Sequence, residues 1–258
     1  MNKDKVLLAT ELYIKAVFPV LNVLLKDDPK TRENFKNISA NVVLRAKYED
    51  TFMGANLIFK NGELHIDENF DAKADLVFTF STLKKMNAFL SGGIAIPSIK
   101  GIKNIKLLVS FISMLLTLKL MLPTTRPKDK HKRYLKVKLA LFMVSTALSK
   151  LNKSGDPDMQ EWTSRQPDRI YQLSVKDTDI AVYLRVKAGK TKAGRGFYTR
   201  KRPFVHMKFS GVDGALMVLS KDVEFVEAVD KNHIQIEGSP EYAANLNDFM
   251  MRIQVLTT

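Results

Sequence analysis

The sequence contains no cysteine, one tryptophan and four histidines in 258 residues. Without cysteine the chain cannot build disulfides, thiolate metal sites or a cysteine nucleophile, and this composition suits a reducing compartment. The four histidines are scattered, and no two of them stand at the spacing of metal ligands. They are His65, His131, His206 and His233. We therefore expect no metal site and no cofactor.

Familiar catalytic and nucleotide-binding patterns are also missing. A Gly-Lys-Thr triplet begins at Gly189, but the glycine that a Walker loop needs five residues earlier is replaced by Leu184. No Gly-x-Ser-x-Gly nucleophile elbow occurs. Glu237 and Glu241 are separated by four positions, yet a glycine and a proline between them interrupt the helix that would align them. The sequence predicts a protein that is not an enzyme.

The beginning of the sequence does not have the pattern of a secretory signal peptide. Glu11 and Lys15 interrupt its apolar stretch, and no small-residue cleavage site follows. We expect a cytoplasmic protein, with peripheral association to a membrane where the charge pattern described next allows it.

Acidic residues are scarce where basic residues are dense, and the net charge is +14. Residues 126–138 contain seven bases and one acid, and residues 187–203 contain seven bases and no acid. Such segments attract polyanions, although a merely solvated surface is the plain alternative. We expect them to dock on anionic membranes through Lys130, Lys132, Arg133, Lys136, Arg195, Arg200, Lys201 and Arg202.

A nucleic acid is the alternative partner for the same two segments. Phe197 and Tyr198 lie beside Arg195 and Arg200 in the sequence, and aromatic rings next to cations are typical of surfaces on which bases stack.

The first half of the chain alternates between helical and strand patterns. Residues 5–26 read as a helix with a kink or break at Pro19. Period-two alternation and the hairpin dipeptide Asn61-Gly62 then predict four strands between residues 42 and 80. A helix at 82–90 and a short segment at 99–103 follow.

The apolar segment 105–122 is long enough to approach a membrane span. Its polar residues, Lys106, Ser110, Ser113 and Thr117, are spaced four, three and four apart, so they form one thin stripe on a helix. This pattern favours a helix that is buried on most sides or lines an apolar space, with a transmembrane helix as the alternative.

The second half repeats the order of elements after a basic helix at 130–152 and an exposed connection at 153–168. Phe209-Ser210 corresponds to Phe80-Ser81, and Ile236-Glu-Gly238 corresponds to Ile99-Lys-Gly101. Strands are predicted at 170–175, 180–186, 204–209 and 234–238, with a basic glycine-rich turn at 188–196, helical spacing at 211–229 and a final helix from Ser239.

These two blocks resemble the sterol carrier protein type two domain over about residues 35–122 and 170–256. The resemblance rests on a strand that begins Ala74-Asp75, an amphipathic helix, a short glycine-bearing strand and an apolar closing helix. In the second block it rests on Phe209-Ser210, Met217-Val-Leu219 and Ile234–Gly238. It implies a five-stranded sheet covered by helices and an apolar tunnel for a sterol, fatty acid, acyl-coenzyme A or phospholipid.

We therefore expect an α+β protein with two tandem sterol-carrier-like units. Each unit would be a mainly antiparallel sheet covered by helices and would enclose an apolar cavity. The expected divisions are residues 1–122 for an N-terminal helix and the first unit, 123–169 for a basic linker and helix, and 170–258 for the second unit.

The expected function is non-catalytic lipid binding or transfer at anionic membranes. A membrane-associated scaffold and the nucleic-acid-binding protein are the alternatives, and the oligomeric state stays open. Burying each methylene of a lipid contributes about 0.8 kcal/mol, so a tunnel needs a wide apolar wall. The candidate wall residues are Met86, Phe89, Leu90, Leu108, Phe111, Ile112, Leu115, Leu216, Leu219, Phe225, Phe249 and Met250.

Overall fold

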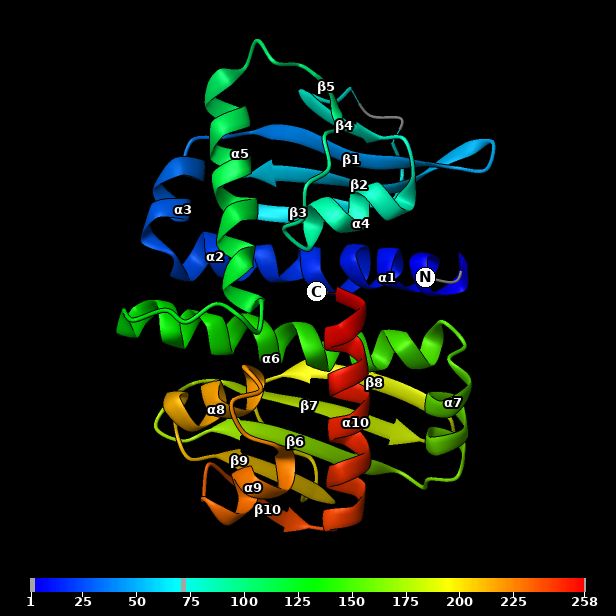
Figure 1. Ribbon diagram of the computed structural model, residues 1–258, viewed down its shortest axis with the longest axis vertical. Coiled ribbons are helices and arrows are strands. Elements are labelled where there is room, and N and C mark those ends of the chain that lie inside the picture. Colours follow the sequence, from blue (N-terminus) through cyan, green and yellow to red (C-terminus); the bar gives the residue numbers. More distant parts are fainter. Residues whose placement is uncertain (1–2, 71–72, 258) are drawn as a thin grey trace. The chain divides into compact units, whose positions relative to one another are not determined.

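The computed structural model describes residues 3–70 and 73–257, and the chain forms two compact units (Figure 1). Unit 1 comprises Met1–Lys119 with Thr257–Thr258, and unit 2 comprises Leu120–Leu256.

Unit 1 is built on a five-stranded sheet of order β3-β2-β1-β4-β5. The central pair β1 and β4 is parallel and the other pairs are antiparallel, so the sheet is mainly antiparallel. Asn61 and Gly62 both have positive φ and form the tight turn between β2 and β3 that the sequence predicts. The strands are β1 (Ala40–Tyr48), β2 (Thr51–Lys60), β3 (Glu63–Asp67), β4 (Leu76–Phe80) and β5 (Ser98–Lys100).

The helices of unit 1 precede the sheet and follow β4. The break predicted near Pro19 is a 3-10 turn, because proline has no N–H to continue the helical ladder. Side chains of Asp28, Thr82 and Asn104 cap three of these helices. The elements are α1 (Lys3–Leu12), a π-helical turn (Tyr13–Val17), a 3-10 turn (Phe18–Val20), α2 (Leu21–Asp27), α3 (Pro29–Phe35), α4 (Leu83–Leu90), α5 (Ile105–Thr117) and a second 3-10 turn (Leu118–Met121).

One helical stretch, Lys5–Asp27, is long and apolar enough to cross a membrane by composition, and 61% of its most apolar window is buried in the structure. Two polar side chains tie it to the rest of unit 1. Thr10 donates to Asn87 Oδ1 of α4 at 3.0 Å, and Asn22 exchanges hydrogen bonds of 2.8 and 2.9 Å with the backbone of Leu64. We therefore treat this stretch as a core helix.

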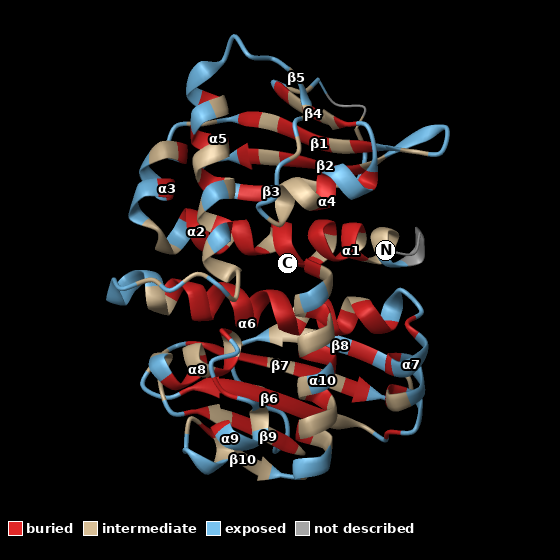
Figure 2. Ribbon diagram, in the orientation of Figure 1, coloured by how far each residue is buried: buried red, intermediate tan, exposed pale blue. Residues whose placement is uncertain are grey.

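The core of unit 1 lies between one face of the sheet and α5. Aromatic rings continue across it, from Phe35 to Phe59 at 4.6 Å and from Phe59 to Phe111 of α5 at 6.2 Å. Phe111 also lies 5.5 Å from Phe78. Figure 2 shows the buried residues concentrated along the strands and on the helix faces that meet them.

Unit 2 repeats this arrangement with a sheet of order β10-β9-β6-β7-β8. Its central pair β6 and β9 is again parallel. The strands are β6 (Arg169–Val175), β7 (Ala181–Lys187), β8 (Lys190–Arg195), β9 (Val205–Phe209) and β10 (Ile234–Gly238). The helices are α6 (Lys130–Lys153), α7 (Pro157–Ser164), α8 (Val212–Leu219), α9 (Phe225–Asp230) and α10 (Pro240–Thr257).

Two glycines mark the correspondence between the units most sharply. Gly101 follows β5 and Gly238 ends β10, and both have positive φ, of 88° and 100°. A Cβ at either position would lie 2.0 Å from a backbone carbonyl oxygen, that of Asp75 or of Phe204. The same close approach therefore recurs in both units, and the α+β class with two tandem units is confirmed.

Three sequence-based assignments differ in the structure. The expected glycine-rich turn at 188–196 contains β8, because Ala188 and Gly189 alone make the turn, both with positive φ. Residues 123–169 do not stand apart from the second unit, since α6 packs on β7 and β8 and the division of the chain falls after Lys119. Part of the expected connection at 153–168 is the helix α7, which Asp156 caps.

Candidate functional site

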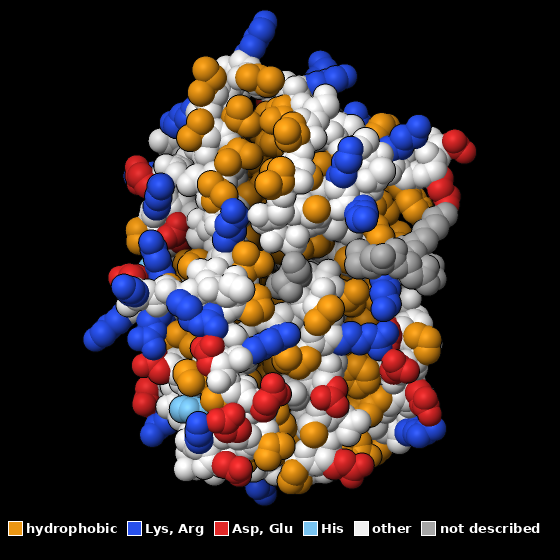
Figure 3. All heavy atoms as spheres, viewed as in Figure 1, with side chains coloured by type: hydrophobic (Ala, Val, Ile, Leu, Met, Phe, Trp, Pro, Cys, Tyr) orange, Lys and Arg blue, Asp and Glu red, His pale blue; other side chains and the backbone are white. Residues whose placement is uncertain are grey.

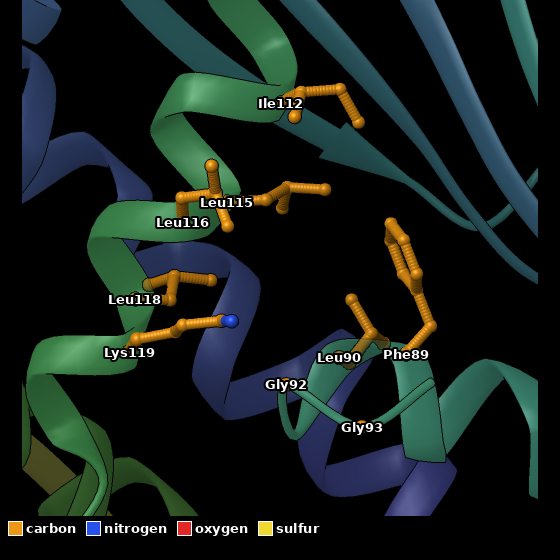
Figure 4. A pocket seen from close by; sticks show the side chains of 9 residues that line it. All are labelled: Phe89, Leu90, Gly92, Gly93, Ile112, Leu115, Leu116, Leu118 and Lys119. Carbon is orange, nitrogen blue, oxygen red and sulfur yellow. The ribbon is translucent and has the colours of Figure 1, made fainter. Parts of the chain in front are cut away.

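An apolar pocket opens in unit 1 between the end of α4 and the second half of α5 (Figure 4). Its volume is about 180 Å³. Ile112 and Leu115 point from α5 toward Phe89 and Leu90 at the end of α4. The lining residues are Phe89, Leu90, Gly92, Gly93, Ile112, Leu115, Leu116, Leu118 and Lys119.

Phe89 joins this pocket to the core of unit 1. Its ring lies 5.2 Å from Phe80 and 6.5 Å from Phe78, and both of those rings are fully buried strand residues. Gly92 has a φ of 85° and its N–H donates to the carbonyl of Phe89 at 3.1 Å, which ends α4 beside the pocket. The pocket wall is thus fixed by core packing on one side and by a helix end on the other.

Lys119 brings a positive charge to the rim of this apolar space. It follows Leu118, which is buried and lines the pocket, and the amine of Lys119 lies at the same opening in Figure 4. An apolar cavity with a cation at its rim can hold an alkyl chain that ends in an anionic group.

The predicted wall of unit 1 divides into pocket and core residues. Phe89, Leu90, Ile112 and Leu115 line the pocket. Met86 and Phe111 are completely buried in the core, and Leu108 is half-buried away from the pocket lining. The correction follows from the rotation of α5, which turns Phe111 toward Phe59 and Phe78 of the sheet.

Several lining residues were absent from the sequence-based prediction. Leu116, Leu118 and Lys119 continue the helical spacing of Ile112 and Leu115, so an extension of the same stripe would have found them. In the predicted polar stripe of this helix Lys106 is exposed but Ser110 is only 6% exposed, while the apolar Val109 is 61% exposed.

The predicted wall residues of unit 2 lie in different surroundings. Leu216 lines a pocket of about 420 Å³ that also contains the charged residues Arg126, Arg133, Asp213 and Asp222. Leu219 and Phe225 are partly exposed, while Phe249 and Met250 are buried.

In unit 2 the helices α8 and α10 take the places of α4 and α5. Phe249 of α10 packs on a different side, 5.4 Å from the ring of Trp162 in α7. Gln254 of α10 donates to the carbonyl of Leu219 at 3.0 Å, which ties α10 to the end of α8.

Half of the cations predicted for the membrane surface have partners inside unit 2. Lys136 is 1% exposed, and its amine donates to the carbonyls of Leu122 at 2.9 Å and Thr125 at 2.7 Å. Burial and the nearby Arg126 lower the pKa of Lys136 to about 8. Lys136 is therefore a structural residue, and its assignment to a membrane surface is wrong.

The other three cations with partners are more accessible than Lys136. Arg133 pairs with Asp213, Lys201 lies 3.2 Å from Asp168, and the guanidinium of Arg195 lies 4.6 Å from the centre of the Phe142 ring. Lys130, Lys132, Arg200 and Arg202 are exposed.

The face of the second sheet opposite its apolar core carries polar residues. Tyr183, Arg185, Lys192 and Arg200 help to line a groove of about 200 Å³, which the segment 196–200 borders. Arg185 donates two hydrogen bonds to the carboxylate of Asp168, at 2.7 and 2.8 Å, and they hold the pKa of Asp168 well below its usual range.

The same polar face brings together Ser174 and His206, a pair that sequence analysis did not connect. The serine oxygen lies 2.8 Å from Nε2 of His206, because β6 and β9 run parallel in adjacent positions. Burial and the neighbouring Lys208 lower the pKa of His206. Within residues 3–70 and 73–257 no carboxylate hydrogen bond to this histidine is found, and no cluster of three or more His, Asp or Glu could hold a metal ion. Glu237 stands opposite His206 on β10, and its carboxylate pairs with Lys208.

Comparisons with known proteins add structural neighbours. No family model and no curated protein matches the sequence. A solved UbiJ-SCP2 ubiquinone synthesis protein is similar over 43% of this chain and 92% of its own, with 9% identity and a TM-score of 0.32. Palmitated SCP2L2 from Aedes aegypti is similar over 42% and 90%, with 19% identity and a TM-score of 0.31.

A third neighbour is the sterol carrier protein domain 2 of Helicoverpa armigera, with 18% identity and a TM-score of 0.33 over 45% of this chain and 89% of its own. These three structures carry sterol carrier protein or SCP2 in their names, and two structures of the sec-alkylsulfatase Pisa1 are also similar, over 64% of this chain with 10–12% identity.

Proposed function

We propose that the protein is a non-catalytic lipid-binding protein and that unit 1 holds an alkyl chain in its apolar pocket. The observation that carries this proposal is the set of side chains from α4 and α5 that converge on one open space, with Lys119 at its rim. Ligand sites are typically concave and apolar with a few polar groups that fix orientation, and this pocket has that composition.

The pocket volume limits the ligand. An engineered cavity of about 150 Å³ holds one benzene molecule, and drug-sized ligands occupy about 300–1,000 Å³. At about 180 Å³ the pocket accepts part of an acyl chain rather than a complete sterol. A fatty acid, an acyl-coenzyme A or a phospholipid fits better, because each has a chain that can enter and an anionic group that can remain near Lys119.

The proposal is tested by titrating delipidated protein with a medium-chain fatty acid and with the alcohol of the same length. Binding of both is expected, with the acid binding more tightly because the alcohol cannot pair with Lys119. The proposal would be refuted if neither the acid nor the alcohol binds at millimolar concentration.

We also propose that the exposed cations of the two basic segments attract the protein to anionic membranes at the cytoplasmic face. Lys130, Lys132, Arg200 and Arg202 support this proposal because they are exposed, and each cation near an anionic surface contributes about 1 kcal/mol. Reversing the charge of Lys132 and Arg200 should lower binding to anionic vesicles while fatty-acid uptake stays unchanged.

A nucleic acid is the second candidate partner, and its proposed binding site is the cationic groove of unit 2. Phe197 and Tyr198 border this groove together with Arg195 and Arg200, so rings and cations lie together. A mobility shift at low salt that disappears steeply as salt rises would favour this candidate. No shift at low salt would eliminate it.

A further inference from the structure

Unit 1 exposes six large aliphatic side chains within residues 94–116, which we call the isoleucine surface. Among the described residues, the other exposed large hydrophobic side chains are scattered: Phe52, Phe197, Val226 and Val255. Figure 3 shows hydrophobic side chains gathered over α5 and the neighbouring segment. The members of the isoleucine surface, with their exposed fractions, are Ile94 (100%), Ile96 (89%), Ile102 (55%), Ile105 (66%), Val109 (61%) and Leu116 (53%).

The helix α5 is apolar on two sides. Leu107, Phe111 and Met114 are buried against the core. Ile105, Val109 and Leu116 form a second stripe, in which the half-buried Ile112 completes spacings of four, three and four. Packing against the core uses only one apolar face of α5, and the second apolar face is in contact with water. Contiguous exposed apolar patches of this kind mark interaction sites.

The charges around the isoleucine surface identify its partner. No aspartate or glutamate occurs from Leu76 to Lys128. Lys100, Lys103 and Lys106 alternate with the isoleucines and are exposed, and they form no ion pair within the described part of the chain. Lys103 and Lys106 stand at the N-terminal end of α5, where positive charge opposes the helix dipole. Apolar side chains interleaved with lysine are suited to the headgroup layer of an anionic bilayer.

The isoleucine surface is continuous with the pocket. Leu116 belongs to both, and Gly93 of the pocket lining directly precedes Ile94. A bilayer that covers this surface would therefore cover the mouth of the pocket as well.

We propose that the isoleucine surface inserts into the headgroup layer of an anionic bilayer, with Lys100, Lys103 and Lys106 on lipid phosphates. The pocket then exchanges its alkyl chain with the membrane without passing it through water. The exchange rests on the function proposed above, whereas the insertion does not.

The test compares I94S/I96S with the matched control V226S/V255S, which changes two exposed aliphatic residues elsewhere. Flotation uses vesicles of phosphatidylcholine with phosphatidylserine. I94S/I96S should bind at least about tenfold more weakly, since full burial of one such side chain is worth more than a factor of ten. The control should bind like the wild type. Because both isoleucines are almost fully exposed, the thermal unfolding of I94S/I96S should stay unchanged.

A second variant separates charge from insertion. K100Q/K103Q/K106Q should lose about fivefold in vesicle affinity per lysine, and this loss should vanish on vesicles of phosphatidylcholine alone. Unchanged flotation of I94S/I96S would overturn the proposal. It would also be overturned if the wild type sedimented as a dimer that I94S/I96S converts to a monomer while neither protein binds vesicles.

The two proposals fail in different ways. If I94S/I96S takes up soluble fatty acid like the wild type but no longer binds vesicles, both proposals are supported. If the wild type binds vesicles but takes up no fatty acid, the proposed insertion is supported and only the proposed function of the pocket is refuted.

Discussion

Replacing Leu115 by asparagine tests the pocket by placing a polar amide of similar size in its wall. A pocket of about 180 Å³ holds about six methylene-sized groups, if each occupies about the 30 Å³ of a small molecule in a liquid. At about 0.8 kcal/mol for each methylene, the buried chain contributes about 5 kcal/mol. That corresponds to a dissociation constant of about 0.2 mM for the buried chain alone.

An amide that faces the chain without a hydrogen-bond partner costs about 1–3 kcal/mol. We therefore expect L115N to bind decanoate about five- to 150-fold more weakly than the wild type. Because Leu115 is only half-buried, the loss of folding stability should stay near about 1 kcal/mol.

Isothermal titration of decanoate in the absence of vesicles measures this effect. The matched control is V109N, which introduces the same amide at an exposed position of α5 away from the pocket lining. V109N should bind decanoate like the wild type. Equal affinities of L115N and the wild type, with both proteins folded, would refute the assignment of the pocket.

Three further predictions concern the rim and the framework of the fold. K119Q should weaken binding of decanoate and leave binding of decanol unchanged in the same titration, and an equal loss for both ligands would contradict a carboxylate contact. The pKa of Lys136, about 8, lies below its ordinary value of 10.5, so the unfolded chain holds the proton more strongly between these values. The stability of the wild type should therefore rise relative to K136M, by roughly 3 kcal/mol, as the pH increases from about 8 to about 10.5 in urea unfolding. Parallel pH profiles would show that the amine is not buried. G101A and G238A should each lose about 2 kcal/mol or more, because positive φ and a carbonyl 2.0 Å from the new Cβ act together. G62A, with positive φ and open space, should lose only about 1 kcal/mol, and equal losses in all three variants would contradict the close approach.

Much of the sheet architecture was predictable from the sequence because its signals are local. Period-two alternation and Asn61-Gly62 predict the β2–β3 hairpin, and the correspondence of Gly101 with Gly238 reflects one backbone geometry in two units. The strand β8 was missed because Gly189 and Gly194 resemble a loop. Gly194 stands there because the ring of Tyr183 on β7 lies over it, and that contact depends on strand pairing.

The site was predictable only in part because sequence does not fix the rotation of a helix that is apolar on two sides. Either stripe of α5 could face the core, and the rings of Phe59 and Phe78 decide the choice by receiving Phe111. The basic segments show the same limit. Charge density is visible in the sequence, but the burial of Lys136 beneath two carbonyls depends on the turn at residues 122–125.

The most direct test of the central claim is mass spectrometry of lipids extracted from the purified wild-type protein and from L115N. The pocket predicts that molecules with an acyl chain and an anionic group accompany the wild type and are strongly depleted in L115N, while the V226S/V255S control, which lies outside both the pocket and the isoleucine surface, retains them. Equal amounts of the same lipids on all three proteins, or none on the folded wild type, would contradict the claim that unit 1 holds an alkyl chain between α4 and α5.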